Sequence, residues 1–123
     1  FIRARKMTEE RRRNSNILDA ALDSHTDATI LKESKGVYWN YQYHVVDLGS
    51  RMNEVFDNAF ERGIHVMKED VWDCTAYNFL GLGGAHCPIA KDRNRGLLRL
   101  PNNSFLSNAQ IKIVAHTLLS AFN

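Results

Sequence analysis

The feature that most constrains the fold is a run of apolar residues spaced alternately three and four positions apart. Its members are Tyr38, Tyr41, Val45, Leu48, Met52, Val55 and Ala59. This spacing puts them all on one face of an α-helix, because residues three and four apart are neighbours on a helix surface. Gly63 follows the run and suits the left-handed residue that ends many helices. The sequence therefore predicts an amphipathic helix over about residues 38–62.

Three weaker patterns predict further helices, over about residues 8–24, 68–80 and 108–122. The last is the best defined, because Ser107 and Gln110 have the spacing of a capping box, in which each side chain bonds the other residue's backbone. No alternating strand pattern competes strongly with these helices.

We therefore expect an all-α fold of about four helices packed around the long helix at 38–62. An irregular, glycine-containing and basic loop is expected at 81–100, with Leu97–Leu100 as a short extended piece. The length of 123 residues suits a single domain. We expect a basic N-terminal arm at residues 1–7 and one helical domain at 8–123.

Charge is distributed unevenly along the chain, although the net charge is only +2. Residues 1–13 hold six bases and two acids, residues 14–73 five bases and eleven acids, and residues 74–123 five bases and one acid. Solvated charged faces are the simplest explanation. The alternative is that the basic ends bind an anionic partner, with RNA or another polyanion as the candidates. The residues proposed for that contact are Arg3, Arg5, Lys6, Arg11, Arg12, Arg13, Lys91, Arg93, Arg95 and Arg99.

Aromatic residues are concentrated at the start of the expected long helix. Trp39 and Tyr43 diverge from its apolar face, and exposed Trp and Tyr side chains are typical anchors of protein interfaces. We therefore consider Trp39 and Tyr43 as protein-interface residues, with cover by a neighbouring helix as the alternative.

The two cysteines, Cys74 and Cys87, are separated by a spacing that permits a disulfide, and two free thiols are the equal alternative. Zinc binding by these cysteines with His86 and His65 is disfavoured, because adjacent His86 and Cys87 would have to splay apart and no C-x-x-C is present. The sequence predicts no metal site and no cofactor.

Catalytic patterns are weak. His44, Asp47 and Arg51 would share a helix face, which is more typical of a surface ion pair than of an acid–base pair. The glycines at 81–84 lack the Lys-Ser/Thr ending and the preceding strand of a phosphate-binding loop. No catalytic residue is assigned, and we expect a protein that is not an enzyme.

These features favour a small non-catalytic subunit or adaptor of a larger assembly that contacts other protein subunits. An organellar ribosome or a respiratory complex in mitochondria fits the Arg-rich start, which begins at Phe1. The first alternative is a secreted helical ligand- or receptor-binding domain with one disulfide and a glycan at Asn102. The second is a small hydrolase or metal enzyme. No apolar run reaches the roughly 20 residues of a membrane-spanning helix.

Overall fold

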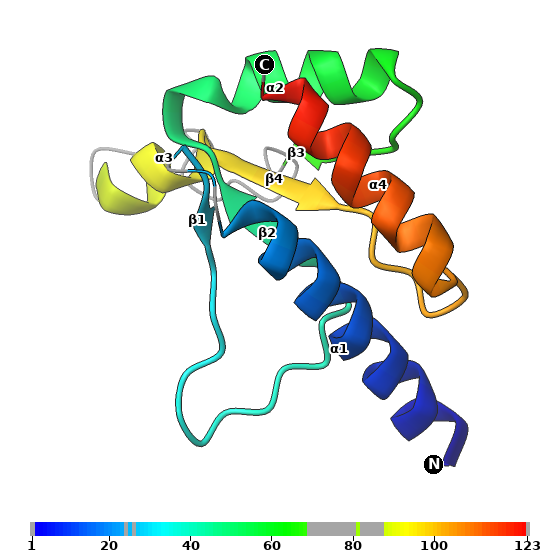
Figure 1. Cartoon of the computed structure of the whole chain (residues 1–123). Coiled ribbons are helices and arrows are strands. Elements are labelled where there is room, and N and C mark those ends of the chain that lie inside the picture. The colour runs from blue at the N-terminus through cyan, green and yellow to red at the C-terminus, as the bar shows by residue number, and fades with distance from the viewer. Residues whose placement is uncertain (1, 24, 26, 69–80, 82–87, 123) are drawn as a thin grey trace.

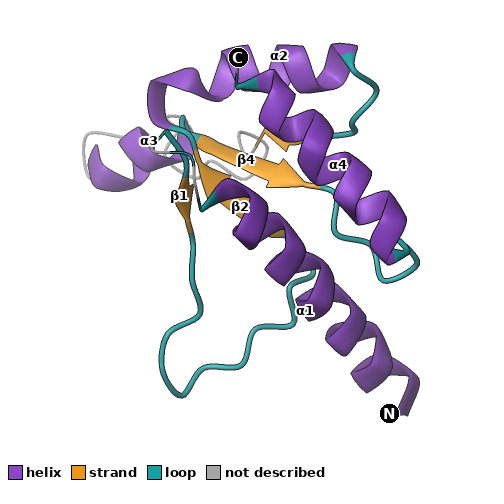
Figure 2. Cartoon of the chain, in the orientation of Figure 1, coloured by secondary structure: helices purple, strands orange, loops and turns teal. Residues whose placement is uncertain are grey.

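Four short strands form an antiparallel sheet in the order β1-β2-β4-β3, with helices packed against it (Figures 1 and 2). The computed structural model describes residues 2–23, 25, 27–68, 81 and 88–122. Its elements are α1 (Ile2–Leu22), β1 (Thr29–Ile30), β2 (His44–Asp47), the 3-10 helix η1 (Gly49–Arg51), α2 (Met52–Glu61), β3 (Met67–Lys68), α3 (Pro88–Asn94), β4 (Leu97–Leu100) and α4 (Asn108–Ala121). The expectation of an all-α fold is therefore wrong.

The core lies between one face of the sheet and the helices α1, α2 and α4. Val46 of β2 is paired with Leu98 of β4, and His44 with Leu100, so all four side chains point to the same face. On the helical side the buried apolar residues are Leu18 and Leu22 of α1, Met52, Val55 and Ala59 of α2, and Ile111, Ala115, Leu118 and Ala121 of α4. The fold is thus an α+β arrangement of two layers.

The expected long helix over residues 38–62 is wrong in its first half. That half is a loop followed by β2, and only Met52–Glu61 is α-helical. Tyr41 has φ 47° and Gly49 has φ 52°, so both residues adopt the left-handed region that interrupts a right-handed helix. The β-branched pair within β2 also favours a strand. The same three-and-four spacing therefore occurs here in a loop and a strand rather than in a helix.

The short-range predictions at the helix ends are confirmed. Gly63 follows α2 with φ 78°. At α4, the Gln110 backbone N–H donates to Ser107 Oγ over 3.3 Å, and the Ser107 backbone N–H donates to Gln110 Oε1 over 2.9 Å. Leu97–Leu100 is extended, as expected, and forms β4.

Other expected boundaries differ. The first helix begins at Ile2 rather than at residue 8, so most of the expected arm at 1–7 is helical. The expected irregular loop at 81–100 contains α3 and β4. The expected helix at 68–80 lies outside the described residues except at Lys68, which belongs to β3.

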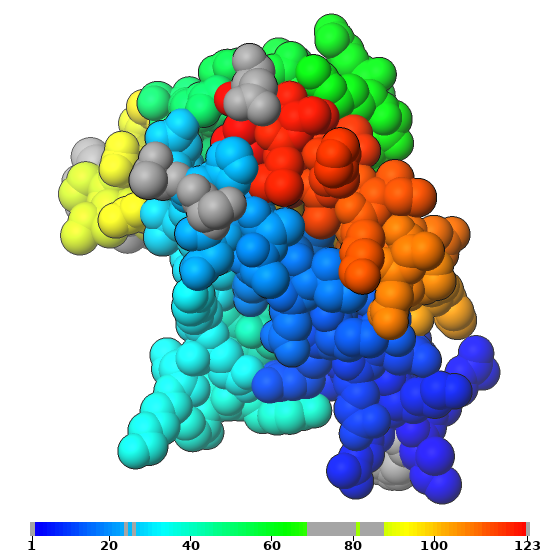
Figure 3. Space-filling model, in the orientation of Figure 1, coloured from blue at the N-terminus to red at the C-terminus, as the bar shows by residue number. Residues whose placement is uncertain are grey.

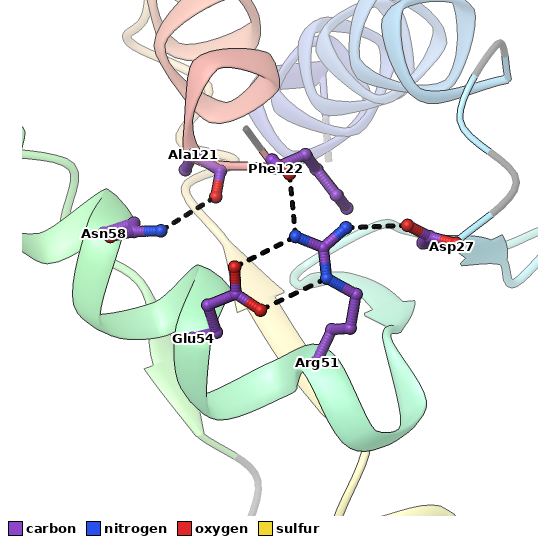
Figure 4. Close-up of polar contacts among 6 residues, drawn as sticks. All are labelled: Asp27, Arg51, Glu54, Asn58, Ala121 and Phe122. Carbon is purple, nitrogen blue, oxygen red and sulfur yellow. Dashed lines mark hydrogen bonds and ion pairs between the residues drawn. The ribbon is translucent and has the colours of Figure 1, made fainter.

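Arg51 ties three parts of the fold together at the end of η1 (Figure 4). Its Nη1 donates to Asp27 Oδ2 over 2.6 Å, and its Nη2 donates to the Phe122 carbonyl over 2.7 Å. Nε and Nη2 also contact both carboxylate oxygens of Glu54, which holds the pKa of Glu54 below its ordinary value. Asn58 of α2 donates to a carbonyl at the end of α4 over 3.1 Å. These bonds fix α4 against α2.

Replacement of Gly96, in the turn before β4, should destabilise the fold. A Cβ added there would collide with Asp47 Oδ1 and would lie 2.8 Å from the Gly49 backbone nitrogen. We expect Gly96→Ala to lower the free energy of unfolding by about 2 kcal/mol, measured by denaturant titration. Gly36→Ala is the control, because open space surrounds Gly36 and only its φ of +83° opposes the substitution, at about 1 kcal/mol. Equal costs for the two variants would contradict the close approach at Gly96.

Candidate functional site

An arginine of α1 holds the long segment between β1 and β2. Arg12 donates from Nη2 to Glu33 Oε2 over 2.7 Å and from Nη1 to the Trp39 carbonyl over 2.8 Å. The Trp39 backbone N–H donates to Glu33 Oε1 over 2.7 Å, and the Arg12 guanidinium lies 4.2 Å from the centre of the Tyr38 ring. The hydrogen bond with Arg12 holds the pKa of Glu33 below its ordinary value, and the same bond raises the pKa of Arg12. Figure 3 shows the segment after β1, in cyan, projecting from the body of the chain.

The contacts of Arg12 with Glu33 and with the Trp39 carbonyl form a clamp, the Arg12–Glu33 clamp. Its loss should release the segment between β1 and β2. In Arg12→Gln we expect the backbone amides of residues 37–43 to exchange with solvent at least tenfold faster, as measured by hydrogen–deuterium exchange, because the bonds to Glu33 and Trp39 are lost. Arg5→Gln is the matched control, since Arg5 forms an ion pair with Glu9 on the exposed side of the same helix. Unchanged exchange in Arg12→Gln would show that other contacts hold the segment.

A buried histidine and a carboxylate face each other beneath that segment. The side chain of His44 is 2% exposed, and its Nε2 lies 3.3 Å from Oδ1 of Asp19 on α1. The orientation of the two groups is not that of a hydrogen bond. Burial lowers the pKa of His44 to about 4 and raises the pKa of Asp19. Tyr41 stacks on the His44 ring at 6.3 Å, and burial raises its pKa as well.

A cavity of about 510 Å³ opens between the first half of α1, residues 42–43 before β2, residues 65–67, the end of β4, and residues 101–106. Arg99 of β4 lines it; the residue is 6% exposed, and its guanidinium lies 4.3 Å from the centre of the Tyr43 ring. Arg11 of α1 lines it from the opposite element. The other described lining residues are Met7, Gln42, His65, Met67, Leu100, Pro101, Asn102, Asn103, Phe105 and Leu106.

The wall of the cavity formed by residues 101–106 is fastened to α1. Asn102 Nδ2 donates to Ser15 Oγ and to the Tyr41 carbonyl, both over 2.9 Å. Asn14 Nδ2 donates to the Asn103 carbonyl over 2.9 Å. Asn102 is 7% exposed, and its amide nitrogen donates both of these hydrogen bonds. Its side chain is therefore not accessible to a glycosylating enzyme in the folded chain.

The structure separates the predicted anion-binding residues into groups. Arg3, Arg5 and Lys6 are exposed on the first turns of α1, and Lys91, Arg93 and Arg95 are exposed on and after α3. Arg93 forms an ion pair with Asp47 over 2.8 Å, and Arg13 donates to the Leu106 carbonyl over 2.9 Å. Arg11 and Arg99 of the predicted set line the cavity described above, whereas Arg12 and Arg13 line a second pocket and Arg93 and Arg95 a third. Binding of RNA or another polyanion by the set stays a prediction.

The other predicted groups are not assembled into a site. His44 faces the helices and Asp47 the opposite side of the sheet, while Arg51 contacts Asp27 and Glu54. Trp39 is half-buried and Tyr43 is 53% exposed, and their role in a protein interface stays a prediction.

Several sequence predictions fall where the structure gives no description. Cys74, Cys87 and His86 lie outside the described residues, as do the glycines at 82–84. Across the described ranges, no three His, Cys, Asp or Glu side chains are grouped so as to hold a metal ion. No helix in this part of the chain is long and apolar enough to cross a bilayer.

Comparison with solved structures identifies the arrangement. The aminotransferase TlmJ from Streptoalloteichus hindustanus matches 98% of this chain with a TM-score of 0.85 and 16% sequence identity, over 33% of its own length. S. venezuelae DesV, solved in complex with a ketimine intermediate, matches 95% of the chain with a TM-score of 0.81 and 17% identity, over 32% of its length. Helicobacter pylori PseC, an aminotransferase involved in the biosynthesis of pseudoaminic acid, matches 94% with a TM-score of 0.79 and 16% identity, over 33% of its length. The chain has the fold of one part of these aminotransferases.

This fold spans about a third of the length of the matched structures. No family model and no curated protein matches the sequence. The expectation of a non-catalytic subunit or adaptor is corrected by these structures, because the fold is that of part of an enzyme. The expectation that the protein is not an enzyme is contradicted by the same structures. The assignment to a mitochondrial ribosome or respiratory complex has no support among them.

The sequence contains no local signal for the residues that hold the site together. Glu33, Asp19 and Ser15 have partners far away in the sequence, and no local motif marks them. The one usable signal was the short extended piece at Leu97–Leu100, since its pairing with β2 brings Arg99 beside Tyr43.

Proposed function

We propose that this chain is one part of an aminotransferase that acts on a sugar-like substrate. The observation that carries the proposal is the match of 98% of the chain to TlmJ at a TM-score of 0.85. PseC supports the substrate class, because pseudoaminic acid is an amino sugar acid and PseC takes part in its biosynthesis.

Aminotransferases use pyridoxal phosphate, which a lysine holds as a Schiff base while an acidic or basic side chain partners the pyridine nitrogen. All lysines of this chain lie within the described residues, and none of them is buried. The only half-buried one, Lys68, donates to Asn53 Oδ1 over 2.8 Å and lies 4.3 Å from the centre of the Phe56 ring. The residues of this chain therefore do not fit the lysine anchor of the cofactor.

The contribution that we assign to this chain is accordingly structural. Its packed sheet and helices provide a rigid body, and the Arg12–Glu33 clamp fixes the segment that leads into β2. In the proposed enzyme, the lysine that binds the cofactor is supplied from outside these 123 residues.

The test is purification of the protein that contains this chain from its own cells, through a tag on the chain. We expect a native mass well above 14.1 kDa, an absorption band of a pyridoxal Schiff base, and transfer of ¹⁵N from labelled amino acids to a keto sugar. Borohydride reduction should leave the pyridoxyl group on a lysine outside these residues. A preparation with no pyridoxal chromophore would overturn the proposal. A pyridoxyl group on Lys68 or any other lysine of this chain would overturn the division of roles.

A further inference from the structure

A groove with a volume of about 670 Å³ runs along the outer face of α1, beside α4. Its apolar lining residues are Ile17 and Ala20 of α1 and, from the segment between β1 and β2, Tyr38, which is 65% exposed. Figure 3 shows α1, in blue, and α4, in orange and red, side by side on this face of the chain. We call this surface the α1 groove; its other lining residues are Glu9, Arg12, Arg13, Asn16 and Lys112.

The α1 groove carries two positive charges that no described carboxylate neutralises. Glu9 and Arg12 are each held in an ion pair with another residue of the chain. Arg13 donates to the Leu106 carbonyl and to a side-chain amide oxygen, both of which are neutral acceptors. Lys112, on α4, is exposed and forms no ion pair with any residue that the structure describes. The apolar surface therefore shares the groove with one cation of α1 and one cation of α4.

The outer face of α2 has the opposite charge. Asp57, Phe60 and Glu61 are spaced three and four positions apart on the side of this helix that faces away from the core, and we call them the α2 ridge. Phe60 is 61% exposed, and its ring is held in place by stacking on Phe56 at 6.1 Å. Both carboxylates of the ridge are exposed and without an ion pair to the described residues, whereas Glu54 on the same helix is paired.

The groove and the ridge complement each other in charge and in polarity. The ridge residues do not line the groove of their own chain, and Figure 3 shows α2, in green, apart from the first half of α1. An aromatic side chain seated in an apolar pocket is a typical interface anchor, and opposite charges around it fix its register. We propose that the α1 groove binds the α2 ridge of a second copy of this chain. Phe60 of one copy lies against Tyr38 and Ile17 of the other, and the two carboxylates face Arg13 and Lys112.

The charge distribution of the sequence favours a second copy as the occupant. The α2 ridge lies within residues 14–73, which hold five bases and eleven acids, whereas Arg13 and Lys112 lie in the basic segments 1–13 and 74–123. The chain thus carries both an anionic helix face and a basic groove that fits it. Because the ridge and the groove are different surfaces, the contact joins copies head to tail, in a closed ring or in an open row. The proposal does not rest on aminotransferase activity.

Sedimentation equilibrium of the 123-residue chain measures this association directly. We expect the weight-average mass to rise above the 14.1 kDa of one copy as the concentration increases from micromolar to near-millimolar. High concentration is needed because a contact of a few residues is smaller than a standard stable interface. Added salt should reduce the rise in mass, since it screens the attraction between the exposed charges.

Charge reversal on each side identifies the two surfaces. Lys112→Glu in the groove and Glu61→Lys in the ridge should each lower the association constant at least tenfold. An equimolar mixture of these two variants should recover the association. In the mixture the intact ridge of the first variant fits the intact groove of the second, and the two reversed charges attract each other. Lys91→Glu is the matched control, because it reverses an exposed lysine of α3 outside both surfaces, and it should leave the association constant within twofold.

The aromatic anchor is tested by Phe60→Ala, which should also lower the association constant at least tenfold. Phe105→Ala is its control, since Phe105 is 76% exposed and belongs to neither surface, and it should leave the constant within twofold. All of these variants should keep the far-ultraviolet circular dichroism of the parent, because the altered side chains are exposed.

Three results would overturn the proposal: the mass of a single copy at every concentration, equal losses in a variant and its control, or no recovery in the mixture. These results would leave the aminotransferase proposal untouched, because that proposal is tested on cofactor and amino transfer in the native protein. Conversely, the association of this chain would persist if the native protein carried no pyridoxal chromophore.

Discussion

Leu98→Ala should lower the free energy of unfolding by about 4 kcal/mol, a large effect for a single substitution. Leu98 is fully buried on the central strand β4, where it is paired with Val46 of β2 and Lys68 of β3. Its side chain points to the face covered by the helices, so its removal leaves a cavity that both layers surround. Denaturant titration at pH 7 measures this loss of free energy. It follows from the shift of the unfolding midpoint, because the dependence of the free energy on denaturant concentration should be the same in both proteins.

Leu97→Ala is the matched control, because Leu97 is the neighbouring residue on the same strand. It is only half-buried and points to the opposite face of the sheet, paired with Asp47. We expect it to cost about 1 kcal/mol, since less apolar area is lost and no enclosed cavity forms. A loss in Leu97→Ala that equals or exceeds the loss in Leu98→Ala would show that the core lies on the other face.

The contrast between these two leucines also shows why the all-α expectation failed. A stretch of four residues, Leu97–Leu100, is too short for its periodicity to reveal which face is buried. The strand is defined by its pairing with β2 and β3, which are distant in the sequence. In Tyr38–Leu48, the three-and-four spacing fits a helix equally well. The left-handed backbone at Tyr41 and the pairing of β2 with β4 exclude one.

Predictions that depend on neighbouring residues succeeded for the corresponding reason. The Ser107–Gln110 capping box is formed within four residues, so the sequence contains all of its parts. Gly63 ends α2 through its own backbone freedom. The start of the first helix was misplaced because Thr8 suits a cap, whereas its hydroxyl donates to the Ala4 carbonyl inside α1 over 3.1 Å.

The sequence identifies several residues of the candidate site but not their arrangement. Arg11 and Arg99 are both in the predicted anion-binding set, and Tyr43 is predicted as a protein-interface residue. Nothing local indicates that the fold brings all three to one cavity. The aminotransferase fold had no signal at all, because the lysines of the chain lie in no recognisable cofactor motif and its sequence identity to the matched enzymes is 16–17%.

Acidification should destabilise the fold before its ordinary carboxylates titrate, and His44 is the reason. Burial lowers the pKa of His44 to about 4, whereas the unfolded chain binds the same proton near the ordinary value of 6.5. As the pH falls below 6.5, the unfolded state takes up a proton that the folded state does not accept. Stability is therefore full above pH 6.5 and is lost progressively down to about pH 4, by about 3 kcal/mol in total.

The neighbouring carboxylate acts in the opposite direction. Because burial raises the pKa of Asp19, the folded state binds that proton more readily than the unfolded state, which adds stability as the pH falls through the titration of Asp19. Glu33 and Glu54 have lowered pKa values, so their contribution is lost below the ordinary carboxylate value of 4.5. The interval between pH 6.5 and 5 therefore reports mainly on His44.

Denaturant titrations of the parent and of His44→Gln over this interval separate the histidine from the carboxylates. The variant should be less stable at pH 7 and should show a flat profile where the parent declines. His65→Gln removes an exposed histidine on the loop before β3 and should retain the slope of the parent. Proton NMR of the His44 ring provides an independent measurement, since its resonance should stay that of the neutral imidazole down to about pH 4. If the ring instead titrates near pH 6.5, then Asp19, only 3.3 Å away, stabilises the imidazolium enough to offset burial, and the acid sensitivity must come from the carboxylates.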